Sequence, residues 1–347
     1  METGLTTQRQ CFVCRIKCTM QSTDIKPADT KKMRIPFRLL LGIYVIVPIL
    51  LTIVLADTFF FDNALRPYVN LSLRATFIYL FFFELPHIFA SYISFADKEY
   101  LKTYKKLLLY HVPIILIAGC ILTFFSTELA IMLIIGYTMY HAILQQTGIA
   151  KMLLGTKHLL HRYWSSLAVI IAISVQLYLV RVPTFTQIPL IYFFTFFWIC
   201  VILFITFSTL IYLQAKPGIG KTYFAATSLM LTSAILFFIL GYPFFAILVV
   251  RFPHDITAFA IYITHDTNRN AATINNSIYK FFAPLRIPIL VLLPLLGIGL
   301  SYLLRYQLHI YDGIVYAGIL VNFPHYYLEG YIWKHDTPHR KQLAFQP

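Results

Sequence analysis

The chain has 347 residues, of which 59% are hydrophobic and only 12% are charged, whereas soluble domains carry about 25% charged residues. A soluble globular fold of this length is therefore excluded. The formal net charge is +14, but the basic residues lie in the N-terminal tail and in short segments between apolar runs, without the aromatic-interleaved patches that suit nucleic acid, so nucleic-acid binding is also excluded.

In chain order, residues 1–36 are polar and basic, and we expect them to form a disordered cytoplasmic tail. Apolar runs then recur near the length of about 20 residues that crosses a hydrocarbon core about 30 Å thick. They predict an all-α, polytopic integral membrane bundle in residues 37–334, followed by a cytoplasmic C-terminal tail at 335–347. The ten expected spans are 37–56, 72–95, 107–125, 128–148, 164–180, 188–213, 223–241, 243–264, 284–304 and 313–333.

The division between the seventh and eighth spans depends on Gly241, Tyr242 and Pro243, which suit either a tight turn or a kink in one longer helix. The distribution of basic residues favours the turn. The basic segments between spans fall on the same side of the membrane as both tails only if there are ten crossings. Both termini are then cytoplasmic, and we expect the protein in a bacterial inner membrane.

Two apparent motifs lack the context that their chemistry needs. Cys11, Cys14 and Cys18 could bind zinc or be acylated, but no His/Cys pair follows at zinc-finger spacing. The sequence AKPGIGKT at 215–222 satisfies a relaxed phosphate-loop pattern, yet it lies between two apolar spans instead of following a buried strand. We interpret its Pro and Gly residues as a turn.

The informative residues are the ionisable side chains inside apolar spans, because each costs a few kcal/mol at the bilayer centre. They are Glu84, His87, His141, Arg251, His254, Asp255, His325 and Glu329. In the expected topology the four helices that carry the histidines run in the same direction. At about 1.5 Å per residue, all four histidines lie roughly 13 to 18 Å from the cytoplasmic ends of their helices, which places them in one layer.

This matched depth predicts a shared metal site with His87, His141, His254 and His325 as ligands. Glu84 is three residues before His87 and Glu329 is four after His325, so each pair shares a helix face. Glu84 and Glu329 are expected to act as additional ligands or catalytic bases. Asp255, a further catalytic candidate, would orient the rings together with Gln145 and Asn322, and Tyr140 and Tyr326 are candidate proton donors. Taken singly, each histidine could instead serve only to pack two helices, by a hydrogen bond from its ring to a carbonyl or hydroxyl group of the neighbouring helix.

Other histidines carry weaker expectations. His265 and Asp266 would form either a cytoplasmic mouth of the site or a second polar cluster, because about 16 Å of straight helix separates His265 from His254. We expect solvated surface positions for the histidines in loops and tails, which are His158, His161, His309, His335 and His339.

The segments RFPHDITAFAIYITHDTNRN (251–270), NFPHYYLEGYIWK (322–334), LPHIFASYISF (85–95) and YHAILQQTGIAKM (140–152) resemble the signatures of a family of polytopic bacterial membrane proteins that has no assigned activity. More loosely, the Pro-His steps are similar to those of bacterial membrane carotenoid-cleaving dioxygenases, which bind one iron through histidines. Those enzymes continue Pro-His with Gly, whereas Ile88, Asp255 and Tyr326 follow here. The resemblance therefore implies His-bound iron in a helix bundle but does not carry over the substrate.

Imidazole and carboxylate ligands together suit Fe(II) or Zn(II), and we expect iron, with zinc as the alternative. The expected function is a metal-dependent membrane enzyme, a non-haem iron oxygenase acting on a lipid or other apolar substrate that enters from the bilayer, with an electron donor as a further partner. Two alternatives remain. One is a proton-coupled transporter with the same side chains as a relay, and the other is a b-type cytochrome.

Overall fold

The computed structural model describes residues 32–69, 78–155, 159–180, 189–307, 318–334 and 336–346. All its helices belong to the larger of two units, Met33–Pro347. Helices make up most of the described residues of this unit, so the predicted all-α class is confirmed. The two short strands, β1 (Ile35–Pro36) and β2 (Phe345–Gln346), pair in parallel.

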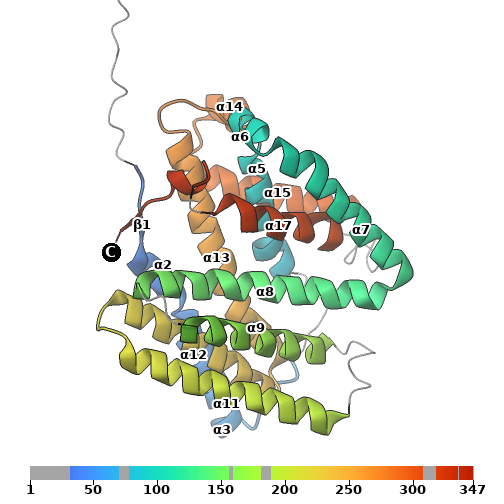
Figure 1. The fold of residues 1–347 in the computed structure, drawn as a ribbon, viewed down its shortest axis with the longest axis vertical. Helices are drawn as coiled ribbons and strands as arrows, with labels where there is room; N and C mark the ends of the chain where they lie inside the picture. The colour runs from blue at the N-terminus through green and yellow to red at the C-terminus, as the bar shows by residue number, and fades with distance from the viewer. Residues whose placement is uncertain are drawn as a thin grey trace, which may run out of the picture. The chain divides into compact units, whose positions relative to one another are not determined.

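Seven helices in the described ranges are long and apolar enough to cross a membrane, and the integral membrane class is therefore supported. Each overlaps an expected span. They are Phe37–Phe60, formed by α2 (Phe37–Ile43) and α3 (Ile46–Phe60), Leu107–Phe125, formed by η2 (Leu107–His111) and α7 (Val112–Phe125), α8 (Thr127–Leu154), α9 (Leu159–Val180), α11 (Leu190–Gln214), α12 (Ile219–Leu240) and α13 (Pro243–Arg269). In Figure 1, α8, α9 and α11 run side by side.

The expected count of ten spans is not confirmed in the described residues. Parts of the expected spans 72–95 and 313–333 lie outside these residues, and a bend precedes most of the expected span 284–304. The count in the described residues becomes eight if Ser277–Leu285 and Ile289–Leu304, which are bent by 112°, form one span. The remaining elements are η1 (Leu80–Glu84), α5 (Leu85–Ser94), α6 (Lys98–Thr103), α14 (Ser277–Phe282), η3 (Ala283–Leu285), α15 (Ile289–Gln307), η4 (Gly318–Asn322), α17 (Phe323–Ile332) and η5 (Arg340–Gln342).

Proline explains why two of these helices are irregular. The π-helical segments η1 and η4 end directly before α5 and α17, whose second residues are Pro86 and Pro324. A proline ring clashes with the carbonyl four residues earlier and offers no N–H, so an α-turn cannot continue unchanged. A wider π-turn relieves the clash, and such turns are frequent at functional sites. Both prolines directly precede a candidate ligand, His87 or His325.

The turn between α12 and α13 resolves the open boundary in favour of two helices. Gly241 follows α12 with φ 79°, in the left-handed region that glycine adopts without strain. Pro243 then begins α13, where its fixed φ suits the first helical turn.

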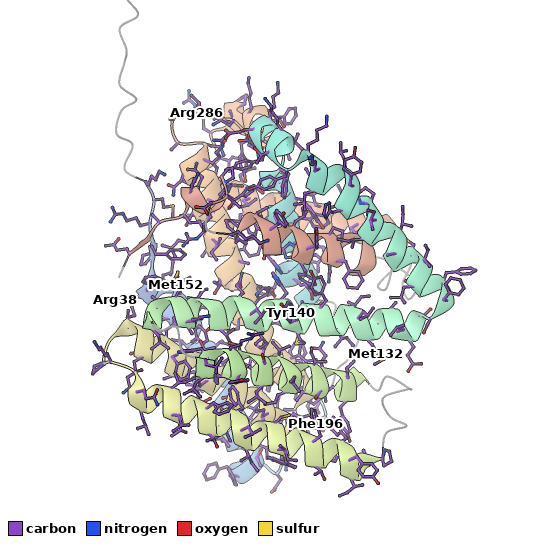
Figure 2. All side chains as sticks on the ribbon, viewed as in Figure 1. Arg38, Met132, Tyr140, Met152, Phe196 and Arg286 are labelled. Carbon is purple, nitrogen blue, oxygen red and sulfur yellow. The ribbon has the colours of Figure 1, made fainter. Side chains whose placement is uncertain are left out.

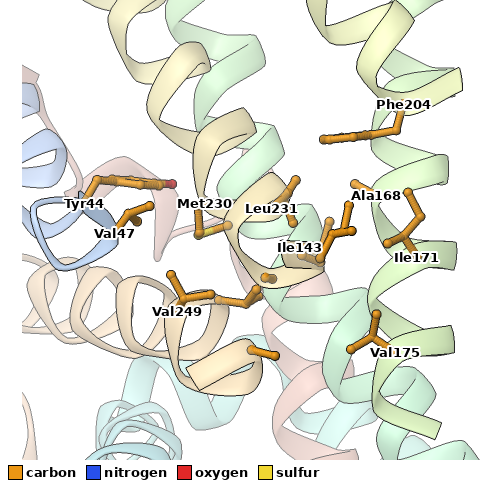
Figure 3. Packing of buried hydrophobic residues seen from close by; sticks show 14 of the residues in the cluster. Tyr44, Val47, Ile143, Ala168, Ile171, Val175, Phe204, Met230, Leu231 and Val249 are labelled. Atoms are coloured by element: carbon orange, nitrogen blue, oxygen red, sulfur yellow. The ribbon is translucent and has the colours of Figure 1, made fainter. Parts of the chain in front are cut away.

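The main hydrophobic core lies between α2, α3, α8, α9, α11, α12 and α13. Figure 3 shows Val47 and Val249 packed near Met230, and Ala168 and Ile171 on the α9 side of the same cluster. Large apolar side chains also cover the outside, as Phe196 on α11 does with half of its surface exposed (Figure 2). An apolar exterior over so many helices is what a lipid-facing surface requires.

The two ends of the described unit are held together. Besides the β1–β2 pair, the side chain of Asn268 accepts from the backbone N–H of Met33 at 2.7 Å and donates to the carbonyl of Gln342 at 2.8 Å. The C-terminus therefore lies beside β1 (Figure 1). If the bundle spans a membrane, ends joined in this way require an even number of crossings, which agrees with the expectation that both tails share one side.

Two histidines that we expected at the solvated surface are buried, and those predictions are wrong. His161 packs edge-on against Trp164 and Phe224, and His339 stacks on Tyr100 at 4.0 Å. His161 lies in the first turn of α9, which begins before the expected span at 164, whereas His339 lies in the C-terminal segment that packs against His265 of α13. The other three histidines of that prediction, at positions 158, 309 and 335, lie outside the described residues.

His265 and Asp266 belong to a second polar cluster at the end of α13, near α6 and α14 (Figure 1). His265 Nδ1 lies 2.6 Å from Asp266 Oδ1, and His265 Nε2 lies 3.0 Å from the hydroxyl of Tyr100. Asp266 also accepts a hydrogen bond from Tyr279, and His339 stacks on His265 at 4.7 Å. The cluster fixes the C-terminal segment against α13, which suits a structural role.

We predict that packing of α15 against α5 controls the position of His87. A Cβ on Gly297 would lie 2.6 Å from the carbonyl oxygen of Pro86, whereas a Cβ on Gly299 of the same helix would meet nothing within 4 Å. Gly297→Ala should destabilise the protein by about 1 to 3 kcal/mol relative to Gly299→Ala, measured as a lower Tm in detergent. Equal Tm values for the two variants would contradict this account of the packing.

A second prediction concerns the loss of stability at low pH. Burial, with the nearby His265 and Arg269, lowers the pKa of His339 to about 2. Neutral His339 therefore stabilises the fold fully above about pH 6.5, the value of the unfolded chain, and this contribution falls as the pH drops towards the folded pKa, by at most about 1.4 kcal/mol per pH unit. Tm of the wild type should fall more steeply between pH 7.5 and 5 than Tm of His339→Gln. Parallel curves would contradict the prediction.

Candidate metal centre

Four imidazole rings from four helices converge, as their matched depths predict. His87 on α5 lies 5.3 Å from His254 on α13 and 5.2 Å from His325 on α17, measured between ring centroids. His141 on α8 lies 5.0 Å from His254 and 5.4 Å from His325. The rings form a closed cycle inside the bundle. His111, by contrast, is exposed and contacts Tyr327.

The first half of the cycle carries a carboxylate from α13. Asp255 Oδ1 lies 3.2 Å from His87 Nδ1 and 3.9 Å from His254 Nε2. All three residues are buried, Asp255 completely. Two histidines and one carboxylate thus form one group of possible metal ligands.

The second half repeats this composition with a carboxylate from α17. Glu329 Oε2 lies 3.0 Å from His141 Nε2, and Glu329 Oε1 lies 3.9 Å from His325 Nε2. In each group one helix provides a histidine and a carboxylate, and a second helix provides one further histidine. The two groups contact each other through the cycle of rings.

Each group could hold a metal ion on geometric grounds. The three candidate ligand atoms of a group lie within 4.8 Å of one another. Neighbouring ligands around an octahedral or tetrahedral ion with bonds of about 2.1 Å are separated by about 3 to 3.5 Å. The observed separations to the carboxylates, 3.0 to 3.9 Å, therefore need only small side-chain movements to match.

Hydrogen bonds fix the tautomer of His325. Ser91 Oγ donates its proton to the carbonyl of Ile88 at 2.6 Å and lies 2.8 Å from His325 Nδ1. Because the hydroxyl proton is already used, His325 Nδ1 must donate to Ser91, which leaves the lone pair on Nε2. His87 Nδ1 lies 3.2 Å from Asp255 Oδ1 and 3.3 Å from the carbonyl of Phe83, so the tautomer of His87 is not fixed by these contacts.

Each carboxylate is anchored by one tyrosine hydroxyl. Tyr79 donates to Asp255 Oδ2, and Tyr262 donates to Glu329 Oε1 at 2.5 Å. Such partners orient a carboxylate that ligates a metal. These residues escaped the sequence analysis, although Tyr79 stands eight residues before His87 and Tyr262 eight after His254, which is within about 80° of the same helix face.

Several buried atoms of the two groups have no hydrogen-bond partner among the described residues. These atoms are His87 Nε2, His141 Nε2, His254 Nδ1, His325 Nε2 and Asp255 Oδ1. Buried polar atoms in native proteins are almost always partnered, and an unexplained set of them can mark a bound ion. Three carboxylates also face a single arginine here, so the ionised cluster has two excess negative charges that a cation would offset.

Not every predicted site residue joins these groups. Glu84 pairs with Arg251 at 2.5 Å instead of facing the rings, because both side chains lie one turn before the histidines of their helices. Asn322 donates to Glu84 at 3.1 Å. Gln145 accepts a hydrogen bond from its neighbour in sequence, Gln146, at 3.4 Å.

The two tyrosines proposed as proton donors differ in position. Tyr140 is 48% exposed on α8 and stacks on Tyr137 (Figure 2). Tyr326 is buried, stacks on His141 at 4.6 Å and shares a hydrogen bond with Thr138 at 3.0 Å. Tyr326 is therefore the better placed of the two.

Comparisons with known proteins identify no relative of this chain. No family model matches the chain, and neither a curated protein nor a solved structure does. The site must be interpreted from its own geometry.

We predict that purified protein binds up to two divalent ions per chain. Asp255→Ala and Glu329→Ala should each remove about one ion, because each deletes a ligand of one group only. His111→Ala is the control and should retain the wild-type content. Metal content is measured by inductively coupled plasma mass spectrometry after loading and desalting. Wild-type protein that retains no iron, zinc, manganese or copper would contradict the prediction.

Proposed function

We propose that this protein is a metal-dependent integral membrane enzyme, a non-haem iron oxygenase that acts on an apolar substrate. The observation that carries the proposal is the pair of groups His87, His254, Asp255 and His141, His325, Glu329. Two histidines and one carboxylate with open positions are the ligand set typical of non-haem Fe(II) oxygenases. Zinc with a hydrolytic reaction is the alternative for the same ligands.

An apolar cavity supports the substrate class. It lies between α8, α9, α11, α12 and α13, has a volume of about 20 Å³, and every lining residue except Gln176 is apolar. Its lining on α9 and α12 includes Ala168, Ile171 and Leu231 (Figure 3). The cavity shares α8 and α13 with the metal centre, and its lining agrees with an apolar substrate.

The residues of the centre have separate roles in this proposal. The four histidines and the two carboxylates hold the metal, which would activate O₂. Tyr79 and Tyr262 keep the carboxylates oriented. Insertion of one oxygen atom into a C–H bond consumes two electrons and two protons and releases the second atom as water, so an electron donor is required as a partner.

The relay of a proton-coupled transporter remains the rival function. It would use the same buried histidines and carboxylates. The closed cycle of four rings favours the metal, because a relay needs a chain of donors and acceptors that leads towards both membrane faces, whereas these side chains converge on one point.

The test uses full-length protein in nanodiscs that contain a lipid extract of cells expressing it, loaded with Fe(II) and supplied with ascorbate. Wild-type protein should incorporate isotopically labelled oxygen from O₂ into a lipid, detected by mass spectrometry. His254→Ala should lower this incorporation at least about 100-fold, because it deletes a ligand on which the reaction depends. No incorporation by iron-loaded wild type, together with proton flux in proteoliposomes, would favour the relay instead.

A further inference from the structure

One four-residue step occurs on three of the helices that carry the metal-centre histidines. It consists of a polar residue, an apolar residue, proline and histidine: ELPH at 84–87, RFPH at 251–254 and NFPH at 322–325. Residues three apart share a helix face and are separated by about 4.5 Å along the axis. The polar residues Glu84, Arg251 and Asn322 therefore form a second layer, one turn from the histidines.

The three polar side chains of this layer contact one another. Arg251 Nη2 lies 2.5 Å from Glu84 Oε1, and Asn322 Nδ2 donates to the same oxygen at 3.1 Å. The assignment of the Asn322 amide follows from this contact, because a carboxylate oxygen can only accept from the NH₂ group. All three residues are more than nine-tenths buried.

Each of the three side chains retains one atom without a partner among the described residues. The atoms are Glu84 Oε2, Arg251 Nε and Asn322 Oδ1. One is a donor and two are acceptors, and a buried group of this kind loses the hydrogen bonds it would make with water. The positive and negative charges of Arg251 and Glu84 already balance, so the layer has no need of an ionic partner.

We propose that Glu84, Arg251 and Asn322 bind the hydroxyl group of an apolar alcohol. A hydroxyl accepts one hydrogen bond from Arg251 Nε–H and donates one to Glu84 Oε2 or Asn322 Oδ1. A carboxylate would face the charge of Glu84 with no proton to donate, and a hydrocarbon would leave all three atoms unpartnered. The binding of this alcohol requires no metal. The further step of calling the alcohol a substrate rests on the proposed function.

The layer has apolar neighbours on α13. Arg251 directly follows Val250, which lines the apolar cavity, and it precedes His254 by one turn. Thr138 on α8 lies three residues before His141, in the same layer, but its hydroxyl is already shared with Tyr326. Thr138 therefore provides a matched residue that takes no part in the proposed contact.

The experiment measures saturable photolabelling of full-length protein in nanodiscs by a diazirine analogue of cetyl alcohol. Unlabelled cetyl alcohol should compete, whereas hexadecane and palmitate should not. Arg251→Lys keeps the ion pair with Glu84 but deletes Nε, and Asn322→Leu deletes Oδ1. Each should weaken competition by cetyl alcohol about five- to tenfold, while Thr138→Val should match the wild type.

Metal content is measured on the same preparations, because neither Arg251 nor Asn322 belongs to the ligand groups. Unchanged metal content shows that a variant with weakened alcohol binding has kept its fold. If all three probes compete equally, or if Arg251→Lys and Asn322→Leu bind the alcohol as the wild type does, the layer holds only water and this proposal is overturned. Alcohol-selective binding by wild-type protein that retains no metal after loading would uphold this proposal, while the missing metal would count against the metal-dependent function.

Discussion

The structure depends on one constraint, which is that ionisable side chains inside an apolar bundle have no water with which to pair. The chain places three carboxylates, one arginine and four histidines close together inside the bundle. These side chains must therefore form hydrogen bonds and ion pairs with one another. Their contacts divide into two layers. Glu84, Arg251 and Asn322 form one, and the cycle of histidines with Asp255 and Glu329 forms the other. What the side chains leave unpartnered indicates where a ligand belongs.

Proline determines how these layers are built. In α5 and α17 the ring of Pro86 or Pro324 prevents a regular α-turn, and a π-helical turn precedes it. On all three helices a polar residue and a histidine three positions apart face the interior, because residues three apart share a helix face. In α13, Pro253 occupies the same place within a continuous helix. Close packing of α15 at Gly297 then holds α5 in position.

The sequence predicted the centre better than its surroundings. Matched helix depth was enough to bring His87, His141, His254 and His325 together, because position along a membrane helix can be counted in residues. The partner of Glu84 could not be derived, since it depends on the rotation of α13 relative to α5. Burial of His161 and His339 was also missed, because α9 begins before its expected span and the C-terminal segment packs on the bundle. The count of ten spans assumed that every apolar run forms one straight helix, whereas Ser277–Leu285 and Ile289–Leu304 are bent by 112°, and parts of two other expected spans lie outside the described residues.

The proposed centre requires that the two groups hold metal ions side by side. The most direct measurement is electron paramagnetic resonance of protein loaded with Mn(II). Two ions in adjacent groups should give an exchange-coupled spectrum, and Asp255→Ala, which leaves one complete group, should give the six-line signal of an isolated ion. An isolated-ion spectrum for the wild type at full loading would mean that the four histidines share a single ion. A spectrum of free Mn(II) alone, with none bound, would contradict the metal centre itself.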